Sequence, residues 1–105
     1  MKIIYNKIIP FRGFKAINLF GVLFVRKGMY MSVCDIQHEM IHTKQMKELG
    51  CVFFYIWYVI EWLVKLCLYG KNAYYNISFE REAYKWQCAE QYLSMRKKYS
   101  FLKYL

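Results

Sequence analysis

Acidic residues are scarce in this sequence, in which seven Asp and Glu face sixteen Lys and Arg and leave a formal net charge of +9. This excess of positive charge makes nucleic acids and anionic lipids candidate partners. The basic residues are dispersed, however, and the one run of three is Arg96-Lys97-Lys98. A solvated helix end explains that run, so we do not expect nucleic-acid binding.

The sequence also lacks closely paired cysteines and an N-terminal signal. The four cysteines are Cys34, Cys51, Cys67 and Cys88, and none of them forms a CxxC pair. Their spacing predicts no zinc site, and we expect reduced, buried thiols in a reducing compartment. Residues 1–15 contain no unbroken apolar stretch and no small-residue cleavage site, so no signal peptide is expected. The expected location is cytoplasmic or membrane-associated.

No repeat, low-complexity tract or linker divides the chain, and its length suits a single domain over residues 1–105. Hydrophobic residues make up 58% of the sequence and aromatic residues 21%, which excludes a disordered chain. So many aromatic rings belong in a dense core or on a surface that meets a membrane or a partner.

Strands are predicted in the N-terminal quarter. Residues 2–9 and 16–26 are rich in Ile, Val, Leu and Phe, and residues 10–13 between them have turn chemistry. We expect the two segments to pair as a β-hairpin. Gly21, inside the second segment, indicates a bulge or a close backbone approach.

The first of three predicted helices covers residues 33–49. Ser32 and Asp35 have the spacing of a capping box, and Gly50 is a helix stop. The third helix is predicted over residues 78–99, where apolar residues recur at helical spacing. Those residues are Phe79, Ala83, Trp86, Ala89 and Leu93. The expected fold class is therefore α+β, with a hairpin packed on three helices.

The second predicted helix, residues 51–69, has two open interpretations. Nineteen helical residues span about 28 Å, close to the thickness of a bilayer core, and the only charges are Glu61 and Lys65, which are spaced to form a pair. Tyr and Trp occur throughout rather than at the ends, which is untypical of a membrane span. A core helix of a small domain explains the segment equally well.

The most specific motif is His38-Glu39-Met40-Ile41-His42, which has the pattern HExxH and lies in the first predicted helix. Two histidines four residues apart project from one helical face and suit one metal ion. Glu39 is rotated about 100° from His38, so its carboxylate lies beside the metal and can transfer protons. The alternative is an amphipathic surface helix with two solvated histidines.

A catalytic zinc takes three protein ligands and keeps a fourth position open. Both histidines are already used, so downstream carboxylates are the candidates for the third ligand. The candidates are Glu61, Glu80, Glu82 and Glu90. Glu80 and Glu82 point about 200° apart on a helix and cannot easily bind one metal together. Each also suits the first turn of a helix for purely structural reasons.

The HExxH helix followed by Glu80-x-x-Ala83 resembles the gluzincin metallopeptidases, among them thermolysin and the integral-membrane prenyl-protein and heat-shock proteases. In that family a glutamate of a later helix is the third zinc ligand, and the pattern E-x-x-A-D assigns it to Glu80. The aspartate position holds Tyr84 here, so a carboxylate that would orient a histidine is missing. Periodicity favours Glu82, which lies nearer the apolar stripe and stays the alternative ligand.

The sequence also resembles small bacterial HExxH proteins in which a glutamine follows the motif, as Gln45 does, before an aromatic helix and Phe-Glu-x-Glu-Ala. In zincins a strand beside the motif helix often binds extended substrate, and residues 16–26 are the candidate strand.

The expected function is zinc-dependent peptide hydrolysis by a minimal zincin-like domain, with Zn²⁺ as cofactor and a peptide or protein as substrate. The alternative is a zinc-binding structural or interaction domain without catalysis. A third possibility is a small membrane-associated protein in which residues 51–69 span or lie on the bilayer.

Overall fold

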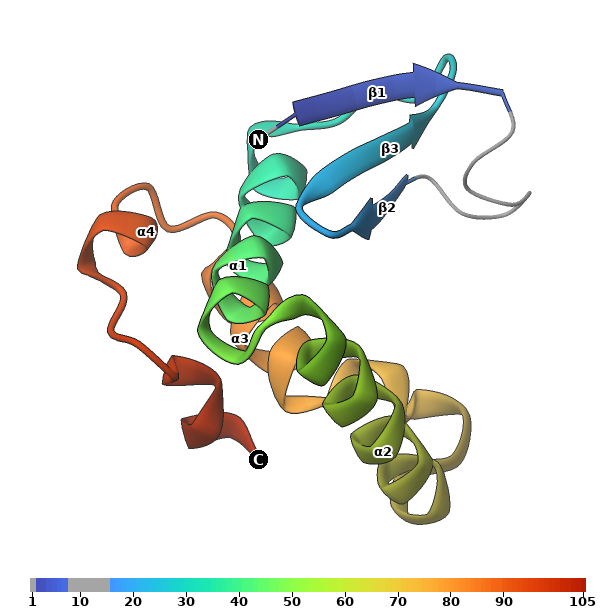
Figure 1. The fold of residues 1–105 in the computed structure, drawn as a ribbon, viewed down its shortest axis with the longest axis vertical. Coiled ribbons are helices and arrows are strands. Elements are labelled where there is room, and N and C mark those ends of the chain that lie inside the picture. The colour runs from blue at the N-terminus through green and yellow to red at the C-terminus, as the bar shows by residue number, and fades with distance from the viewer. Residues whose placement is uncertain (1, 8–15) are drawn as a thin grey trace.

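The computed structural model describes residues 2–7 and 16–105. Figure 1 shows a small sheet at one end of the molecule and helices at the other, joined by the long first helix. The expected α+β class is confirmed. The elements are β1 (Lys2–Asn6), β2 (Ala16–Leu19), β3 (Val22–Arg26), α1 (Val33–Leu49), α2 (Cys51–Tyr69), α3 (Ser78–Trp86) and α4 (Tyr92–Met95), with the 3₁₀ turns η1 (Gly70–Asn72), η2 (Tyr74–Asn76) and η3 (Ser100–Tyr104).

The sheet has the strand order β1-β3-β2, and its hairpin is β2-β3. A two-residue turn of Phe20 and Gly21, with φ of 54° and 86°, separates these strands, and two positive φ values are what a tight hairpin turn requires. The prediction of one strand over 16–26 was therefore wrong, as was the bulge at Gly21. β1 does not form a hairpin with this segment but pairs with β3 in parallel. The predicted turn at 10–13 and residues 8–9 lie outside the described residues.

Helices α1 and α2 have the predicted bounds. The Ser32 hydroxyl accepts from the Asp35 N–H at 3.1 Å, and the Asp35 carboxylate accepts from the Ser32 N–H at 3.1 Å, so the predicted capping box is confirmed. Gly50 ends α1 with a φ of 82°. This positive φ turns the chain directly into α2 without a linker, and glycine adopts it without steric cost.

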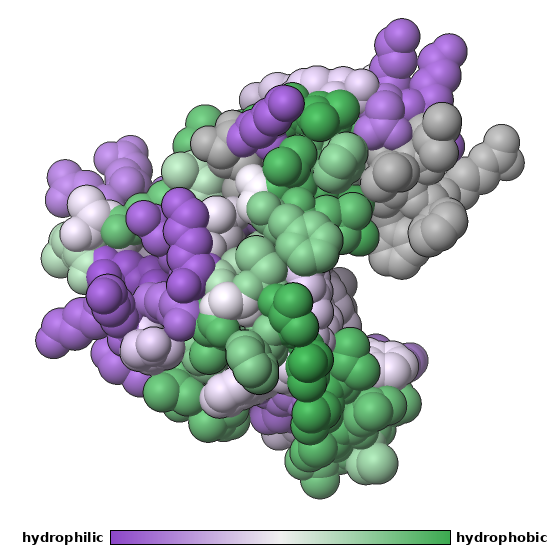
Figure 2. All heavy atoms as spheres, in the orientation of Figure 1, coloured by the Kyte–Doolittle hydropathy of each residue, from purple (hydrophilic) through white to green (hydrophobic). Residues whose placement is uncertain are grey.

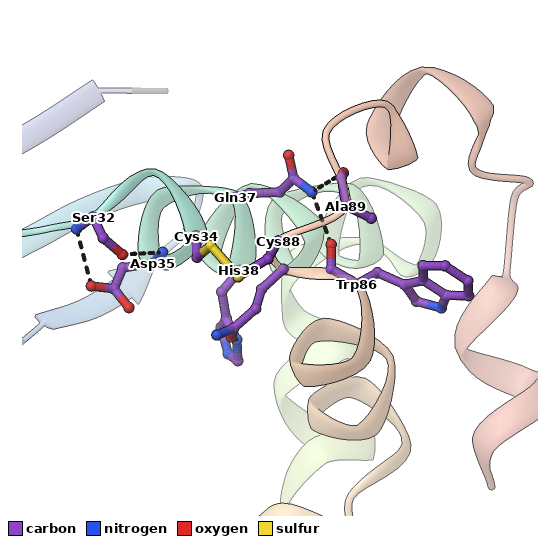
Figure 3. The surroundings of a disulfide bond; sticks show 9 residues. Ser32, Cys34, Asp35, Gln37, His38, Trp86, Cys88 and Ala89 are labelled. Atoms are coloured by element: carbon purple, nitrogen blue, oxygen red, sulfur yellow. Dashed lines mark hydrogen bonds between the residues drawn. A yellow bond between two sulfur atoms is a disulfide. The ribbon is translucent and has the colours of Figure 1, made fainter.

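The third predicted helix is shorter than expected, because α3 ends at Trp86. The Gln37 side-chain amide, on α1, donates to the carbonyl oxygens of Trp86 at 2.9 Å and Ala89 at 2.6 Å. A disulfide joins Cys34 of α1 to Cys88 beside these contacts, with the Cα atoms 4.7 Å apart (Figure 3). Contacts with α1 therefore stop the helix.

The disulfide also corrects the expectation of reduced thiols for two of the four cysteines. Cys34 and Cys88 are 54 positions apart in the sequence, so no short spacing signals their pairing. Cys51 and Cys67 are free, but Cys67 is exposed and Cys51 half-buried, so the expectation that these thiols are buried was wrong for Cys67.

The helical core lies where α1, α2, α3 and the C-terminal turn meet. Phe54 of α2, Phe79 of α3 and Phe101 of η3 are buried and in ring contact, with Phe54–Phe79 and Phe79–Phe101 centroids 4.5 and 4.7 Å apart. A second cluster under the sheet contains Leu23, Val25 and Met31. The packing of Phe79 against α2 fixes the position of α3, which carries the predicted ligand Glu80.

Candidate metal centre

His38 and His42 project from the same face of α1 and are both buried, with 7% and 6% of their surface exposed. Their Nε2 atoms are 3.1 Å apart. Glu80 of α3 completes a triangle, because its Oε1 lies 3.0 Å from Nε2 of His38 and 3.1 Å from Nε2 of His42. Among the described residues, these three form the one group of His, Cys, Asp and Glu side chains placed to hold a metal ion.

The far side of each imidazole meets a glutamine oxygen. Nδ1 of His38 lies 2.7 Å from Oε1 of Gln87, and Nδ1 of His42 lies 2.8 Å from Oε1 of Gln45. The orientation of the Gln45 amide is fixed, since its nitrogen donates to the Phe79 carbonyl and to Glu82 at 3.1 and 3.0 Å. An amide oxygen only accepts, so each Nδ1 carries the proton and donates.

These tautomers leave two Nε2 lone pairs and a carboxylate oxygen directed at one another. Three acceptors in a buried triangle repel unless a cation lies among them. Tetrahedral zinc at about 2.0–2.1 Å from its ligands holds them about 3.3 Å apart, and the sides of this triangle are 3.0–3.1 Å. The donor set fits zinc after shifts of a few tenths of an ångström.

Without a metal, a proton fills this position. Burial lowers the pKa of His42, but the Glu80 carboxylate outweighs burial, with help from Glu39 and Gln45, and raises that pKa to about 9. Burial likewise raises the pKa of Glu80, but the two histidines prevail and hold it well below its usual range. The metal-free site at neutral pH therefore contains an imidazolium bonded to a carboxylate.

Glu80 is held in place by α2. The Tyr58 hydroxyl donates to Oε2 of Glu80 at 2.8 Å, which leaves Oε1 for the histidines. Glu61 is not a ligand: its carboxylate accepts from the N–H and the hydroxyl of Ser78, at the start of α3, and from the indole N–H of Trp57. A carboxylate at a helix N-terminus satisfies an otherwise unpaired N–H and the helix dipole.

Glu61 and Lys65 are spaced to form an ion pair, but the structure shows none between them. Lys65 lies over the Tyr69 ring, with its Nζ 5.7 Å from the centroid. Glu90, the fourth candidate ligand, is exposed in the turn after α3.

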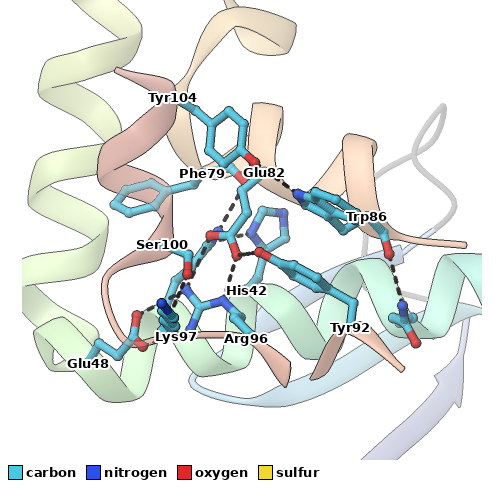
Figure 4. A network of polar contacts seen from close by, with 12 residues as sticks. His42, Glu48, Phe79, Glu82, Trp86, Tyr92, Arg96, Lys97, Ser100 and Tyr104 are labelled. Carbon is cyan, nitrogen blue, oxygen red and sulfur yellow. Dashed lines mark hydrogen bonds and ion pairs between the residues drawn. The ribbon is translucent and has the colours of Figure 1, made fainter. Parts of the chain in front are cut away.

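Glu82 faces away from the histidines and is completely buried. Its carboxylate accepts from Arg96 Nε and the Tyr92 hydroxyl, both at 2.5 Å (Figure 4). Arg96 also forms a two-point ion pair with Glu48 of α1, at 2.7 and 3.0 Å. The link to the metal site runs through the amide of Gln45, so Glu82 positions His42 indirectly.

Glu39 lies next to the triangle on α1 and is half-buried. Burial raises the pKa of its carboxyl group, His42 and His38 oppose the rise, and Glu80 adds to it. The carbonyl oxygen of Glu39 accepts from the Asn18 side-chain amide at 3.0 Å. Strand β2 is thereby fixed beside the motif.

Tyr84, which stands where the gluzincin pattern has an aspartate, contacts His38 edge-on, with ring centroids 4.5 Å apart. The orienting contact expected from that aspartate comes from Gln87 instead. Sequence reasoning missed Gln87 and Tyr58. The sequence contained one indication of Gln87: it follows Glu80 by seven residues and so lies on the same side of a helix.

Other surface features lie away from the triangle. Two cavities, of about 150 and 430 Å³, are lined mainly by the C-terminal segment, and neither includes a residue of the triangle. One helix, Cys51–Asn72, is long and apolar enough to cross a membrane, with a mean hydropathy of 1.8 and 17% of its window buried.

Comparisons of this chain with protein-family models, with curated proteins and with solved structures find no match.

Proposed function

We propose that this protein is a zinc-dependent peptide hydrolase of the gluzincin type. His38, His42 and Glu80 bind the metal, and Glu39 is the general base and acid. The observation that carries the proposal is the buried triangle of two imidazole nitrogens and one carboxylate oxygen with sides of 3.0–3.1 Å.

The number of ligands favours catalysis over a purely structural role. Structural zinc sites are closed by four protein ligands, whereas catalytic sites have three. The described residues supply three and no fourth His, Cys, Asp or Glu. Two of the four cysteines are occupied by the disulfide. The strongest argument for the rival, a non-catalytic zinc domain, is the deep burial of all three ligands.

The chain's own groups suit acid–base chemistry. A bound zinc ion polarises a carbonyl group and makes water acidic near neutral pH. Glu39, with its raised pKa, accepts a proton from the attacking water and delivers it to the leaving amine. Tyr84 is partly exposed against His38, and burial raises the pKa of its phenol. Its hydroxyl therefore stays protonated and can donate a hydrogen bond to a substrate carbonyl.

A peptide substrate is supported by the placement of β2. This strand is an edge of the described sheet, since the strand order is β1-β3-β2. The Asn18 side chain ties it to α1 through Glu39 and Thr43. An extended peptide can add through main-chain hydrogen bonds to the part of this edge that the Tyr55 hydroxyl, which donates to the Asn18 carbonyl, leaves open.

Metal analysis of the purified full chain, offered zinc and then dialysed, tests the proposal. Wild type is expected to hold one zinc per chain, and His38→Ala and Glu80→Gln to hold none. Glu39→Gln is expected to keep zinc and to lose hydrolysis of a fluorogenic peptide library about 10²–10⁴-fold. The matched control is Glu90→Gln, an exposed glutamate outside the triangle.

The two functions are distinguished by Glu39→Gln. If wild type binds zinc and Glu39→Gln hydrolyses the peptide library no more slowly than wild type, the site is structural. If wild type binds no zinc, both proposals fail.

A further inference from the structure

The distribution of charged and apolar side chains on helix α2 is the reverse of that on an ordinary surface helix. Its buried residues are Phe54, Glu61 and Lys65, so both of its charged residues face the protein. Its exposed large side chains are apolar or aromatic, and none is charged. A surface helix in water normally has the opposite pattern, with charges outward and an apolar stripe inward.

The exposed apolar surface wraps most of the way round α2. At about 100° per residue, the exposed side chains extend over about 260° of the helix, and the part not interrupted by the half-buried Tyr55 and Trp57 covers about 160°. One packed helix needs a stripe of only about 100°, so a second copy of the chain would leave part of this surface in water. Lipid chains cover such a surface completely. Figure 2 shows apolar side chains along α2, whereas hydrophilic side chains gather on the side of α4.

The length and burial of α2 agree with a lipid environment. Nineteen residues rise about 28 Å, against about 30 Å for a hydrocarbon core. A core helix of a water-soluble protein with this hydropathy is mostly buried, but here only 17% of the most apolar window is.

A basic groove adjoins the N-terminal end of α2. Lys44 and Lys47 belong to the last turns of α1, which Gly50 joins directly to α2, and they line a groove of about 430 Å³ with Lys98. In the described chain, none of these lysines has an acidic partner within ion-pairing distance, since the groove's Glu48 pairs with Arg96. Lysines at the end of an apolar helix attract anionic headgroups.

We propose that α2 is embedded through its outward face in the hydrocarbon layer of a membrane, with anionic lipid headgroups at the groove of Lys44, Lys47 and Lys98. The occupant of this face is lipid rather than a second copy. The proposal does not rest on the proposed hydrolysis, because none of the three lysines and none of the outward residues of α2 belongs to the metal triangle.

Flotation of the full chain with vesicles tests the proposal. Wild type is expected to float with vesicles of phosphatidylcholine and phosphatidylglycerol, and more weakly with phosphatidylcholine alone. Val59→Glu and Val64→Glu put a charge on the outward face and are expected to reduce the bound fraction at least about tenfold. Val33→Glu makes the same change at an exposed position of α1 and is expected to float like wild type.

A probe at Cys67 reports on the depth of α2. Cys67 is a free, exposed thiol of α2, so after Cys51→Ser an environment-sensitive fluorophore labels it alone. With vesicles, its emission is expected to shift to shorter wavelength and to be quenched by lipids that carry a spin label in the acyl chain. The control label at Tyr30→Cys, an exposed site before α1, is placed after Cys51→Ser and Cys67→Ser and is expected to keep its aqueous spectrum.

Three results would overturn the proposal. The first is wild type that stays in the aqueous fraction with both vesicle types. The second is a Cys67 label that remains unquenched on bound vesicles. The third is a stable dimer without vesicles that Val59→Glu dissociates, because a second copy would then cover α2. Circular dichroism of both glutamate variants in detergent shows whether they fold.

Discussion

Zinc binding is expected to release a proton, because His42 is protonated in the metal-free site. Its pKa of about 9 leaves Nε2 about 99% protonated at pH 7. That nitrogen must lose its proton to bind a metal, whereas Glu80, whose pKa is lowered, is already ionised. Each zinc bound at pH 7 should therefore release about one proton from His42, and apparent affinity should rise about tenfold per pH unit towards pH 9.

Calorimetric titration of zinc at pH 7, in buffers of different ionisation enthalpy, measures the released protons. Competition with a chelator between pH 6.5 and 8 measures the affinity. Glu80→Gln, which lacks the third ligand, is expected to hold no zinc and so to release no protons when zinc is added. Affinity that does not change with pH, or binding without proton release, would refute the protonated His42.

The stability of the metal-free protein should fall as pH rises, whereas the zinc affinity rises with pH. The folded pKa of His42 lies above its ordinary value of 6.5. This group therefore contributes fully to folding below about pH 6.5, and the contribution, up to about 3 kcal/mol, is lost as pH rises through 9. Urea unfolding with a chelator present should show the decline, and zinc-loaded protein should not.

Three further predictions concern residues around the triangle. Cys88→Ser opens a loop of 54 residues and should lower the free energy of unfolding by about 4 kcal/mol in denaturant titration; an unchanged midpoint would show that the disulfide contributes nothing. Gln87→Ala removes the partner of a histidine Nδ1 and should weaken zinc binding about 10–100-fold in chelator competition, while exposed Gln91→Ala should not. Glu61→Ala leaves the N–H of Ser78 unpaired in a buried site and should cost about 1–3 kcal/mol of unfolding free energy; a loss no larger than that of an exposed glutamate would contradict the capping role.

Features with local causes were predictable from the sequence. The bounds of α1 follow from Ser32, Asp35 and Gly50, which act within a few residues of the helix ends. The end of α3 was mispredicted, because the contacts that stop it come from Gln37 and Cys34, on a different helix. The hairpin turn was missed since its first residue is Phe20, and phenylalanine at a positive φ leaves no recognisable turn signal.

Hydrophobic periodicity did not identify which of Glu80 and Glu82 faces the histidines. Both side chains are buried, so α3 has protein on opposite faces. One face meets the histidines and the other meets Arg96. A hydrophobic stripe identifies only one inward direction, and here it pointed towards Glu82. The spacing of the family motif indicated Glu80, the glutamate that the structure brings to both histidines.

The hydrogen bonds of Glu61 and Tyr58 hold α2 and α3 in a fixed relative position. Glu61 bonds the first residue of α3, and Tyr58, one turn earlier on the same helix, bonds Glu80 two residues further on. A slide of α2 along its axis would break both contacts together and withdraw the carboxylate from the histidines. Forces on the apolar exterior of α2 therefore reach Glu80 directly, so the surroundings of that helix and the geometry of the triangle cannot vary independently.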